Sequence, residues 1–202
     1  MVVKIFLFIV LSFMFQANSE KVILFFGDSL SAGYGLSPEE AFPALVEKAL
    51  IKNGAKIKVV NAGLSGETTA GGLARVDWIL RQPVDIFFLE LGGNDGLRGL
   101  PVDQTKKNLQ MIIDKVKAKY PGCKIVLAGM MVPPNMGKEY AAGFQNIFKE
   151  VAKNNNAVLV PFLLEGVGGI EKLNQADGIH PNVEGHKIVA SHLVKVIAPL
   201  LN

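Results

Sequence analysis

One short stretch of the chain could supply a nucleophile for acyl transfer. Gly27-Asp28-Ser29 directly follows the apolar run 22–26, whose β-branched and aromatic residues are typical of a strand buried on both faces. The ligand crevice of an open α/β sheet lies beyond the carboxyl ends of its strands, so Ser29 is a candidate nucleophile. The alternative is an ordinary polar turn, because Gly, Asp and Ser also dominate turns.

A serine hydroxyl needs a base, and the motif DGIHP at 177–181 offers one. Its carboxylate precedes its imidazole by three residues, the glycine between them permits a tight turn, and the proline disfavours helix at the histidine. Asp177 could then fix the tautomer of His180, and His180 could take the Ser29 proton. A turn capped by aspartate is the alternative interpretation.

Acyl transfer also needs donors around the oxygen that becomes negative in the tetrahedral intermediate. The loops after the second and third predicted strands contain Gly66 and Asn94. The backbone N–H groups of Ser29 and Gly66 and the side-chain amide of Asn94 could form this oxyanion hole, since glycine permits close approach. Alternatively, Gly66 is a turn glycine and Asn94 caps its own loop.

The rest of the chain alternates between strand and helix patterns. The predicted strands are 22–26, 56–60, 85–91, 124–129 and 158–160, and the predicted helices are 42–51, which follows a capping box at Ser37-Pro38-Glu39-Glu40, 68–81, 103–119, 139–154 and 183–198. This alternation predicts right-handed crossovers and a parallel sheet covered by helices on both faces. The long connection 161–182, which carries His180, is of the kind that is usually functional or mobile.

Four motifs together resemble the blocks of the GDSL or SGNH hydrolases. They occur in the family order, and the similarity runs from about residue 22 to the end: FFGDSLSAGYG (25–35), VVNAGLSGETTAGGLAR (59–75), LELGGNDGLRGLP (89–101) and DGIHPN (177–182). The resemblance implies a Ser29, His180 and Asp177 triad, with Ser29, Gly66 and Asn94 as the oxyanion hole. It implies a single-domain, three-layer flavodoxin-like α/β fold with a five-stranded parallel sheet. Within the family, the chain is similar to small exported acyl-CoA thioesterases, lysophospholipases and arylesterases.

We therefore expect a serine esterase that cleaves small acyl esters or thioesters, possible lysophospholipids included, through an acyl-enzyme. Apolar residues of two loops are candidates to line the acyl site: Leu97, Leu100, Val102, Met131, Val132, Pro133 and Met136. Ordinary packing of loops on the core is the alternative for these residues. Two other functions stay open, a carbohydrate O-acetylesterase on the same scaffold and a binding module that has lost the chemistry.

Composition limits the partners and the cofactors. A formal net charge of +3 is too weak for a nucleic-acid footprint. The remaining histidines, His186 and His192, fall on a predicted helix, where a partly buried or solvated histidine is the ordinary interpretation. No short-spaced ligand pair predicts a metal, no nucleotide motif predicts a cofactor, and the single cysteine, Cys123, is expected to be a buried thiol.

The first residues have the form of a secretory signal. A basic start at Lys4 precedes the apolar run 5–15 and an Ala-Asn-Ser site at 17–19. The run is shorter than the roughly 20 residues that span a bilayer, so we expect cleavage after Ser19 rather than a stable anchor. We expect residues 20–202 to form one exported, monomeric hydrolase domain. An uncleaved anchor is the alternative.

Overall fold

The structure, a computed structural model, describes residues 20–201, and the predicted signal segment 1–19 lies outside them. Five strands form one sheet in the order β2-β1-β3-β4-β5, and all four pairings are parallel. The strands are β1 (Lys21–Gly27), β2 (Ile57–Asn61), β3 (Ile86–Glu90), β4 (Lys124–Ala128) and β5 (Val158–Val160). This is the flavodoxin strand order, whose switch point lies between β1 and β3.

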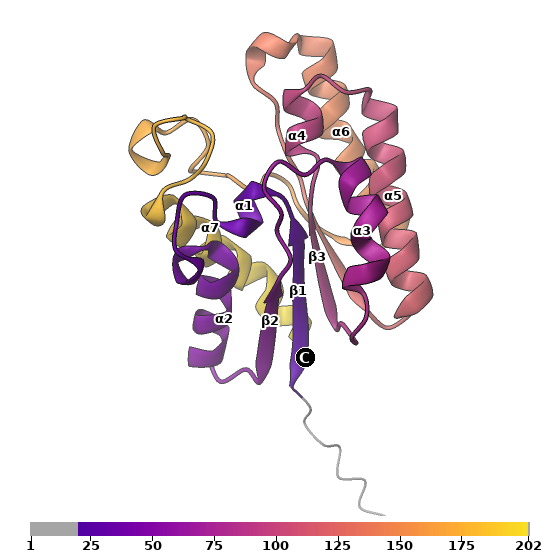
Figure 1. The fold of residues 1–202 in the computed structure, drawn as a ribbon, viewed down its shortest axis with the longest axis vertical. Helices are drawn as coiled ribbons and strands as arrows, with labels where there is room; N and C mark the ends of the chain where they lie inside the picture. Colours follow the sequence, from indigo (N-terminus) through magenta and orange to yellow (C-terminus); the bar gives the residue numbers. More distant parts are fainter. Residues whose placement is uncertain (1–19, 202) are drawn as a thin grey trace, which may run out of the picture.

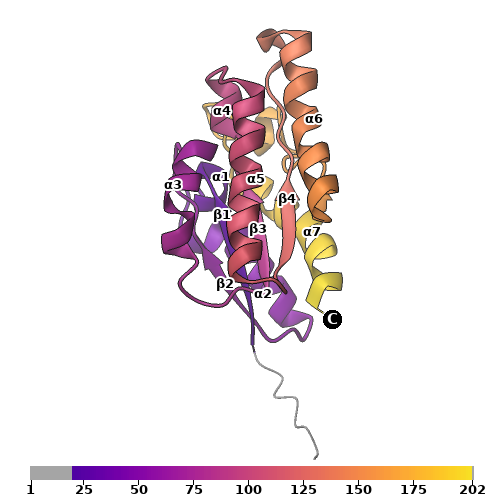
Figure 2. The same cartoon turned by 90° about the vertical axis from the view of Figure 1, so that its right-hand side faces the viewer.

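Helices cover both faces of the sheet, as Figure 1 shows. On one face α2 packs against α7, and on the other α5 packs against both α3 and α6. The long helices are α2 (Phe42–Lys52), α3 (Thr69–Ile79), α5 (Val102–Lys119), α6 (Lys138–Asn155) and α7 (Val183–Ile197). In the view turned by 90° in Figure 2, α3 and α5 lie in front of the sheet. The predicted three-layer α/β architecture is confirmed.

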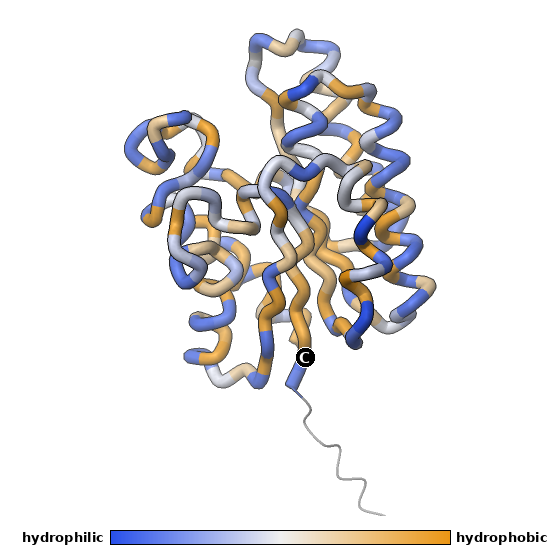
Figure 3. Tube along the Cα trace, viewed as in Figure 1, coloured by the Kyte–Doolittle hydropathy of each residue, from blue (hydrophilic) through white to orange (hydrophobic). Residues whose placement is uncertain are grey.

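The core lies between the sheet and its helical layers. β1 and β3 are its centre: Phe25, Phe26, Phe87 and Phe88 are all fully buried. Their rings pack with centroids 4.8 Å apart for Phe25 and Phe88 and 5.5 Å apart for Phe26 and Phe87. Figure 3 shows the strands as mainly hydrophobic and the helices as mixed. A strand buried on both faces has no need of the alternating pattern, which explains the continuous apolar runs in the sequence.

Two short helices after β1 and β3 are absent from the sequence prediction. They are α1 (Ser29–Ala32) and α4 (Gly93–Leu97), and Figure 1 shows them beyond the carboxyl ends of these two strands. The composition of α4, Gly-Asn-Asp-Gly-Leu, is that of a turn, and α1 is a single turn begun by a serine. Propensity argues against helix in both, so these helices depend on tertiary contacts.

The predicted start of α2 is confirmed in detail. A 3-10 turn, Pro38–Glu40, precedes the helix, and Ser37 and Glu40 form the capping box. The Ser37 hydroxyl donates to Glu40 Oε2 at 2.7 Å. Regular helix then begins at Phe42 with Pro43 in its first turn, where a missing N–H costs nothing. Within residues 20–201, no helix is both long and apolar enough to cross a membrane.

Candidate active site

The nucleophile turn joins β1 to α1 at the switch point of the sheet. Asp28 is the N-cap of α1, and its Oδ1 accepts a hydrogen bond from the Leu30 N–H at 3.0 Å. Ser29 is the first residue of this helix and is 9% exposed. Its carbonyl oxygen accepts hydrogen bonds from Gly33 and Tyr34, which fold the chain back over the turn. The hydroxyl of Ser29 therefore sits on a rigid local structure.

The return segment 161–182 brings the histidine to this turn. An antiparallel bridge between Asn174 and Pro181 closes its last loop, and the Gln175 N–H donates to the His180 carbonyl at 2.7 Å. The Gln175 side-chain amide reaches across the site to the Tyr34 carbonyl, also at 2.7 Å. The rings of Tyr34 and His180 lie with their centroids 4.7 Å apart. The return segment is thus docked directly on the nucleophile turn.

The three predicted triad residues form a continuous hydrogen-bonded chain. His180 Nε2 lies 2.9 Å from Ser29 Oγ, and His180 Nδ1 lies 2.7 Å from Asp177 Oδ2. The other carboxylate oxygen of Asp177 accepts the backbone N–H groups of Ile179 and His180 at 2.9 and 3.0 Å. Gly178 has φ +70°, the left-handed conformation that lets the turn close so tightly.

The charge of the Asp177 carboxylate determines the tautomer of the His180 imidazole. Hydrogen bonds from the His180 backbone N–H, the His180 side chain and the Ile179 N–H lower the pKa of Asp177 to about 2. An ionised carboxylate only accepts hydrogen bonds, so His180 Nδ1 carries the hydrogen. Nε2 then presents its lone pair to the Ser29 hydroxyl. This arrangement can remove the hydroxyl proton when an electrophile approaches.

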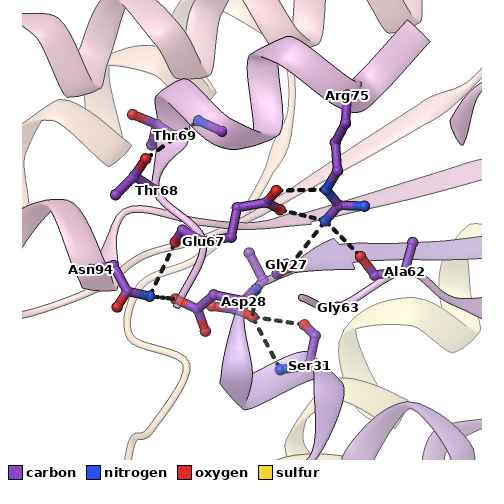
Figure 4. Close-up of polar contacts among 12 residues, drawn as sticks. Gly27, Asp28, Ser31, Ala62, Gly63, Glu67, Thr68, Thr69, Arg75 and Asn94 are labelled. Atoms are coloured by element: carbon purple, nitrogen blue, oxygen red, sulfur yellow. Dashed lines mark hydrogen bonds and ion pairs between the residues drawn. The ribbon is translucent and has the colours of Figure 1, made fainter. Parts of the chain in front are cut away.

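Asn94 and Gly66 lie in loops that are tied together beside the nucleophile turn. Asn94 Nδ2 donates to Asp28 Oδ2 and to the Glu67 carbonyl, each at 3.0 Å, as Figure 4 shows. Gly66 has φ +78°, and its carbonyl accepts a hydrogen bond from Arg98 Nη2 at 2.9 Å. The Asn94 amide therefore links the loops that follow β1, β2 and β3.

Comparison with known proteins decides the family. The model of the GDSL-like lipase/acylhydrolase family matches residues 25–188. The chain belongs to this family. Esterase TesA of Pseudomonas aeruginosa is 40% identical over 187 residues, which cover 92% of each chain. Thioesterase 1/protease 1/lysophospholipase L1 of Escherichia coli K12 is 40% identical over 198 residues, 98% of this chain and 92% of the relative.

A solved structure supports the same conclusion. AlinE4, an esterase of the SGNH-hydrolase family, is 41% identical with a TM-score of 0.75, and the match covers 91% of this chain and 98% of that one. The predicted family and fold are confirmed, and the chain is a hydrolase that acts on ester bonds. A binding module without chemistry, one of the open alternatives, is set aside.

In this GDSL hydrolase, an arginine and a glutamate fix the loop that carries Gly66. Arg75 Nε donates to Glu67 Oε1 at 2.6 Å, and Arg75 Nη2 binds Glu67 Oε2. The same Nη2 reaches the carbonyls of Ala62 at 2.7 Å and Gly27 at 3.4 Å (Figure 4). The guanidinium also lies 4.2 Å above the centroid of the Phe26 ring. One side chain of α3 thus joins the second loop to the end of β1.

Two buried carboxyls lie beneath the nucleophile turn. Asp28 is 2% exposed, and Glu90, the last residue of β3, is fully buried. Glu90 Oε2 accepts hydrogen bonds from the N–H groups of Asp28 and Ser31, at 3.1 and 3.2 Å, and from the Ser31 hydroxyl at 2.7 Å. Burial raises the pKa of Asp28 to about 6, and burial together with the Asp28 charge raises the pKa of Glu90 well above its usual value.

The candidate acyl-site residues come from two loops that lie side by side. A Cβ at Gly96 would lie 2.5 Å from a methyl group of Val132, and one at Gly99 would lie 3.6 Å from the Met136 methyl group. The Tyr140 hydroxyl donates to the Leu100 carbonyl at 2.8 Å. Large apolar side chains in both loops are exposed, Leu97 at 44% and Met131 at 47%. Val102 and Leu100 are half-buried, and Pro133 is exposed.

The other two histidines lie apart from the triad hydrogen bonds. His186 is 1% exposed, and its Nδ1 accepts the N–H of Phe42 at 3.0 Å. Burial, with a smaller effect from His180, lowers its pKa to about 4, so it is neutral and structural. His192 is half-buried. Between residues 20 and 201, no group of three or more His, Cys, Asp or Glu residues could hold a metal ion.

Cys123 differs slightly from its prediction as a buried thiol. It is half-buried, and partial burial raises its pKa to about 11. The thiol is therefore protonated and unreactive at neutral pH.

Sequence reasoning missed three residues that support the site: the half-buried Arg75 and the buried Glu67 and Glu90. A signal for Glu90 exists, because it is the one charged residue within the buried run 86–91, and a buried charge needs a reason. The contacts of Arg75 with Gly27 and Ala62 carry no sequence signal, since they join segments that pair only in the folded sheet.

Proposed function

We propose that this chain is a serine hydrolase in which Ser29 is the nucleophile, His180 the general base and Asp177 the residue that orients it. The observation that carries the proposal is the hydrogen-bonded chain from Asp177 Oδ2 through His180 to Ser29 Oγ, with distances of 2.7 and 2.9 Å. A nucleophile in hydrogen-bond contact with a base, which a third group orients, is the arrangement that activates a hydroxyl.

In the first half of the reaction, Ser29 Oγ attacks the acyl carbon as His180 Nε2 takes its proton. The carbonyl oxygen becomes negative, and the intermediate collapses when the alcohol or thiol leaves with the proton from His180. In the second half, water attacks the acyl-enzyme, His180 takes the proton of the water, and the acid leaves as Ser29 regains its hydrogen. Asp177, ionised throughout, stabilises the imidazolium in both halves.

The oxyanion hole of this proposal consists of the backbone N–H groups of Ser29 and Gly66 and the Asn94 amide. The loop that carries Gly66 is held by Arg98 at its carbonyl, and a Cβ at this glycine would approach no atom closer than the 3.9 Å to Arg98. Glycine is therefore needed for its φ of +78° rather than for space. Asn94 Nδ2 already donates to Asp28 and to Glu67, so it serves the oxyanion by sharing one of these hydrogens.

For substrates, we propose small acyl esters and thioesters, lysophospholipids included. The names of the relatives, an esterase and a thioesterase with lysophospholipase activity, support this range. The apolar side chains of the paired loops, which are exposed or half-buried, suit an acyl chain: Leu97, Leu100, Val102, Met131, Val132, Pro133 and Met136. A series of acyl chain lengths separates this proposal from a carbohydrate O-acetylesterase, which would prefer acetylated sugars over longer acyl esters.

We also propose that residues 1–19 are a signal peptide and that residues 20–202 act as an exported monomer without a cofactor. The basic start, the short apolar run and the small residues before Glu20 support export. Sequencing the amino terminus of the exported protein tests this, because a chain that still begins at Met1 would contradict cleavage. Sedimentation measures the assembly state.

Replacement of the nucleophile is the direct test. Ser29→Ala is expected to lower the kcat for a p-nitrophenyl ester by at least about 10⁴-fold and to leave the fold intact, because it removes only a hydroxyl. A fluorophosphonate probe should label the parent chain at Ser29 and fail to label the variant. The control is Ser191→Ala, an exposed serine of α7, which should leave both readouts unchanged. Retained activity in Ser29→Ala would remove the assignment.

A further inference from the structure

We propose that Glu90 is a positioning residue, a protonated carboxylic acid that pairs with Asp28 and so holds both the nucleophile turn and the Asn94 amide. The proposal rests on the function proposed above, since it concerns the same Ser29 and Asn94. The pair consists of the last residue of β3 and the N-cap of α1, which the pairing of Gly27 with Glu90 brings together.

The geometry calls for a proton in this pair. Both carboxyls are buried, at 0% and 2% exposure, and they are adjacent, since the Asp28 backbone N–H donates to Glu90 Oε2 at 3.1 Å. The donors that reach them are neutral: three backbone N–H groups, the Ser31 hydroxyl and the Asn94 amide. Two adjacent buried anions without a cation are unfavourable, because each is desolvated and they repel each other, and one proton held between them removes most of this cost.

The proton belongs on Glu90 rather than on Asp28. Both oxygens of Asp28 accept hydrogen bonds, from the Leu30 N–H and from the Asn94 amide, and these favour its charged form. Glu90 Oε1 is buried and, among the described residues, has no hydrogen-bond partner. In an ionised carboxylate this oxygen would carry a share of the negative charge with no donor to compensate it. A neutral carboxyl carries no net charge to compensate. The pKa of Glu90, which burial and the Asp28 charge raise, agrees with this assignment.

The site is built around this carboxyl. A Cβ at Gly27 would lie 2.3 Å from Glu90 Oε2 and 2.3 Å from Ser31 Oγ. The glycine of the Gly-Asp-Ser motif therefore provides space here rather than an unusual φ, since its φ is not positive. Through Asp28 the acid acts on the Asn94 amide, and through Ser31 it anchors α1, the helix that begins with Ser29.

Two matched variants of Glu90 test the proposal. Glu90→Gln has the shape and neutrality of the protonated acid, and it is expected to keep kcat within about 3-fold of the parent chain at pH 7. Glu90→Leu removes the acceptor for three donors and is expected to lower kcat by about 10²-fold, the cost of a misplaced oxyanion donor, with a much smaller change in KM. Equal losses of kcat in the two variants would overturn the proposal.

Infrared spectroscopy reads the proton directly and requires neither activity nor Glu90→Leu. The parent chain in D2O at pH 7 is expected to show a C=O band of a protonated carboxyl that Glu90→Gln lacks. A spectrum that Glu90→Gln leaves unchanged in this region would overturn the proposal. Ser29→Ala separates the two hypotheses: it should keep the band while losing turnover. Turnover without Ser29 would refute the nucleophile, whereas the band would still decide the state of Glu90.

Discussion

The two carboxyl-containing regions on either side of Ser29 differ in almost every respect. On the return segment, the side chain of Asp177 is 37% exposed, and its hydrogen bonds lower its pKa to about 2. Beneath the nucleophile turn, Asp28 is 2% exposed, and burial raises its pKa to about 6. The contacts of Asp177 are local, within three residues, whereas the contacts of Glu90 with Asp28 and Ser31 join segments about 60 positions apart.

This difference separates two tasks. The exposed carboxylate controls the charge of an imidazole and contributes little to folding, because solvent screens it. The buried carboxyls control the positions of the backbone and the amide, so they cannot be removed without disturbing the fold. We expect substitution of Asp177 to change the reaction alone and substitutions beneath the turn to change stability and reaction together.

Of the substitutions that compare these two regions, Asp177→Asn is expected to have the largest effect on kcat. The amide can keep the backbone hydrogen bonds of the turn but favours the wrong imidazole tautomer, so kcat should fall by about 10³ to 10⁴-fold. The free energy of unfolding should change by less than about 1 kcal/mol, since the pair is partly exposed. Ester hydrolysis and denaturant unfolding measure the two quantities. Asp77→Asn, at an exposed ion pair with Lys115, is the control that should leave kcat unchanged.

A large loss of stability in Asp177→Asn would contradict the separation of tasks. So would a kcat within 10-fold of the parent chain.

Arg75→Met tests whether a buried charge pair beside the nucleophile turn affects stability and reaction together. It leaves the Glu67 carboxylate, 7% exposed, without its cation, and the free energy of unfolding should fall by about 3 kcal/mol. Because the loop that carries Gly66 loses its anchors at Glu67 and Ala62, kcat should fall as well, by up to about 10²-fold. Urea unfolding and ester hydrolysis measure the two losses.

The double variant Arg75→Met, Glu67→Gln is the control for this interpretation. With no buried charge left unpaired, it should recover much of the stability but not the kcat. Full recovery of both, or no recovery of stability, would show that Arg75 acts otherwise than through this pair.

The difference between local and long-range contacts explains which features could be predicted from the sequence. The contact between Asp177 and His180 could be predicted because the two residues are three positions apart, so local turn geometry joins them. The strands could be predicted from continuous apolar runs such as 22–26, which need no partner to be recognised. Glu90 and Arg75 could not be placed, because their contacts depend on which strands become neighbours.

The short helices are the second feature that could not be predicted from the sequence. The residues of α4, Gly93–Leu97, have the composition of a turn. Asp95 is buried there, and it accepts the Thr69 N–H at 2.8 Å, a bond to the first turn of α3. The helical conformation therefore depends on a contact between segments 26 positions apart, which local propensity does not contain.

Two buried groups, His186 and Asp28, make the free energy of unfolding depend on pH. His186 is buried and its pKa is lowered to about 4, from an ordinary value of 6.5. Below pH 6.5 His186 binds a proton in the unfolded chain, whereas in the folded chain it binds one only at about pH 4. The free energy of unfolding should therefore fall across this window, by up to about 3 kcal/mol. Asp28 acts in the opposite sense, because its raised pKa makes the folded chain take up a proton between about pH 6 and 3.8.

His186→Gln isolates this smallest effect. The glutamine oxygen can accept the Phe42 N–H in place of Nδ1, but it does not titrate. Urea unfolding at several pH values should show the parent chain losing stability relative to the variant as the pH falls from 6.5 to 4. The difference in stability between the two chains removes the contributions of Asp28 and Glu90, because both chains contain these residues. Parallel curves would mean that His186 titrates alike in the folded and unfolded chains, and that its burial does not exclude the proton.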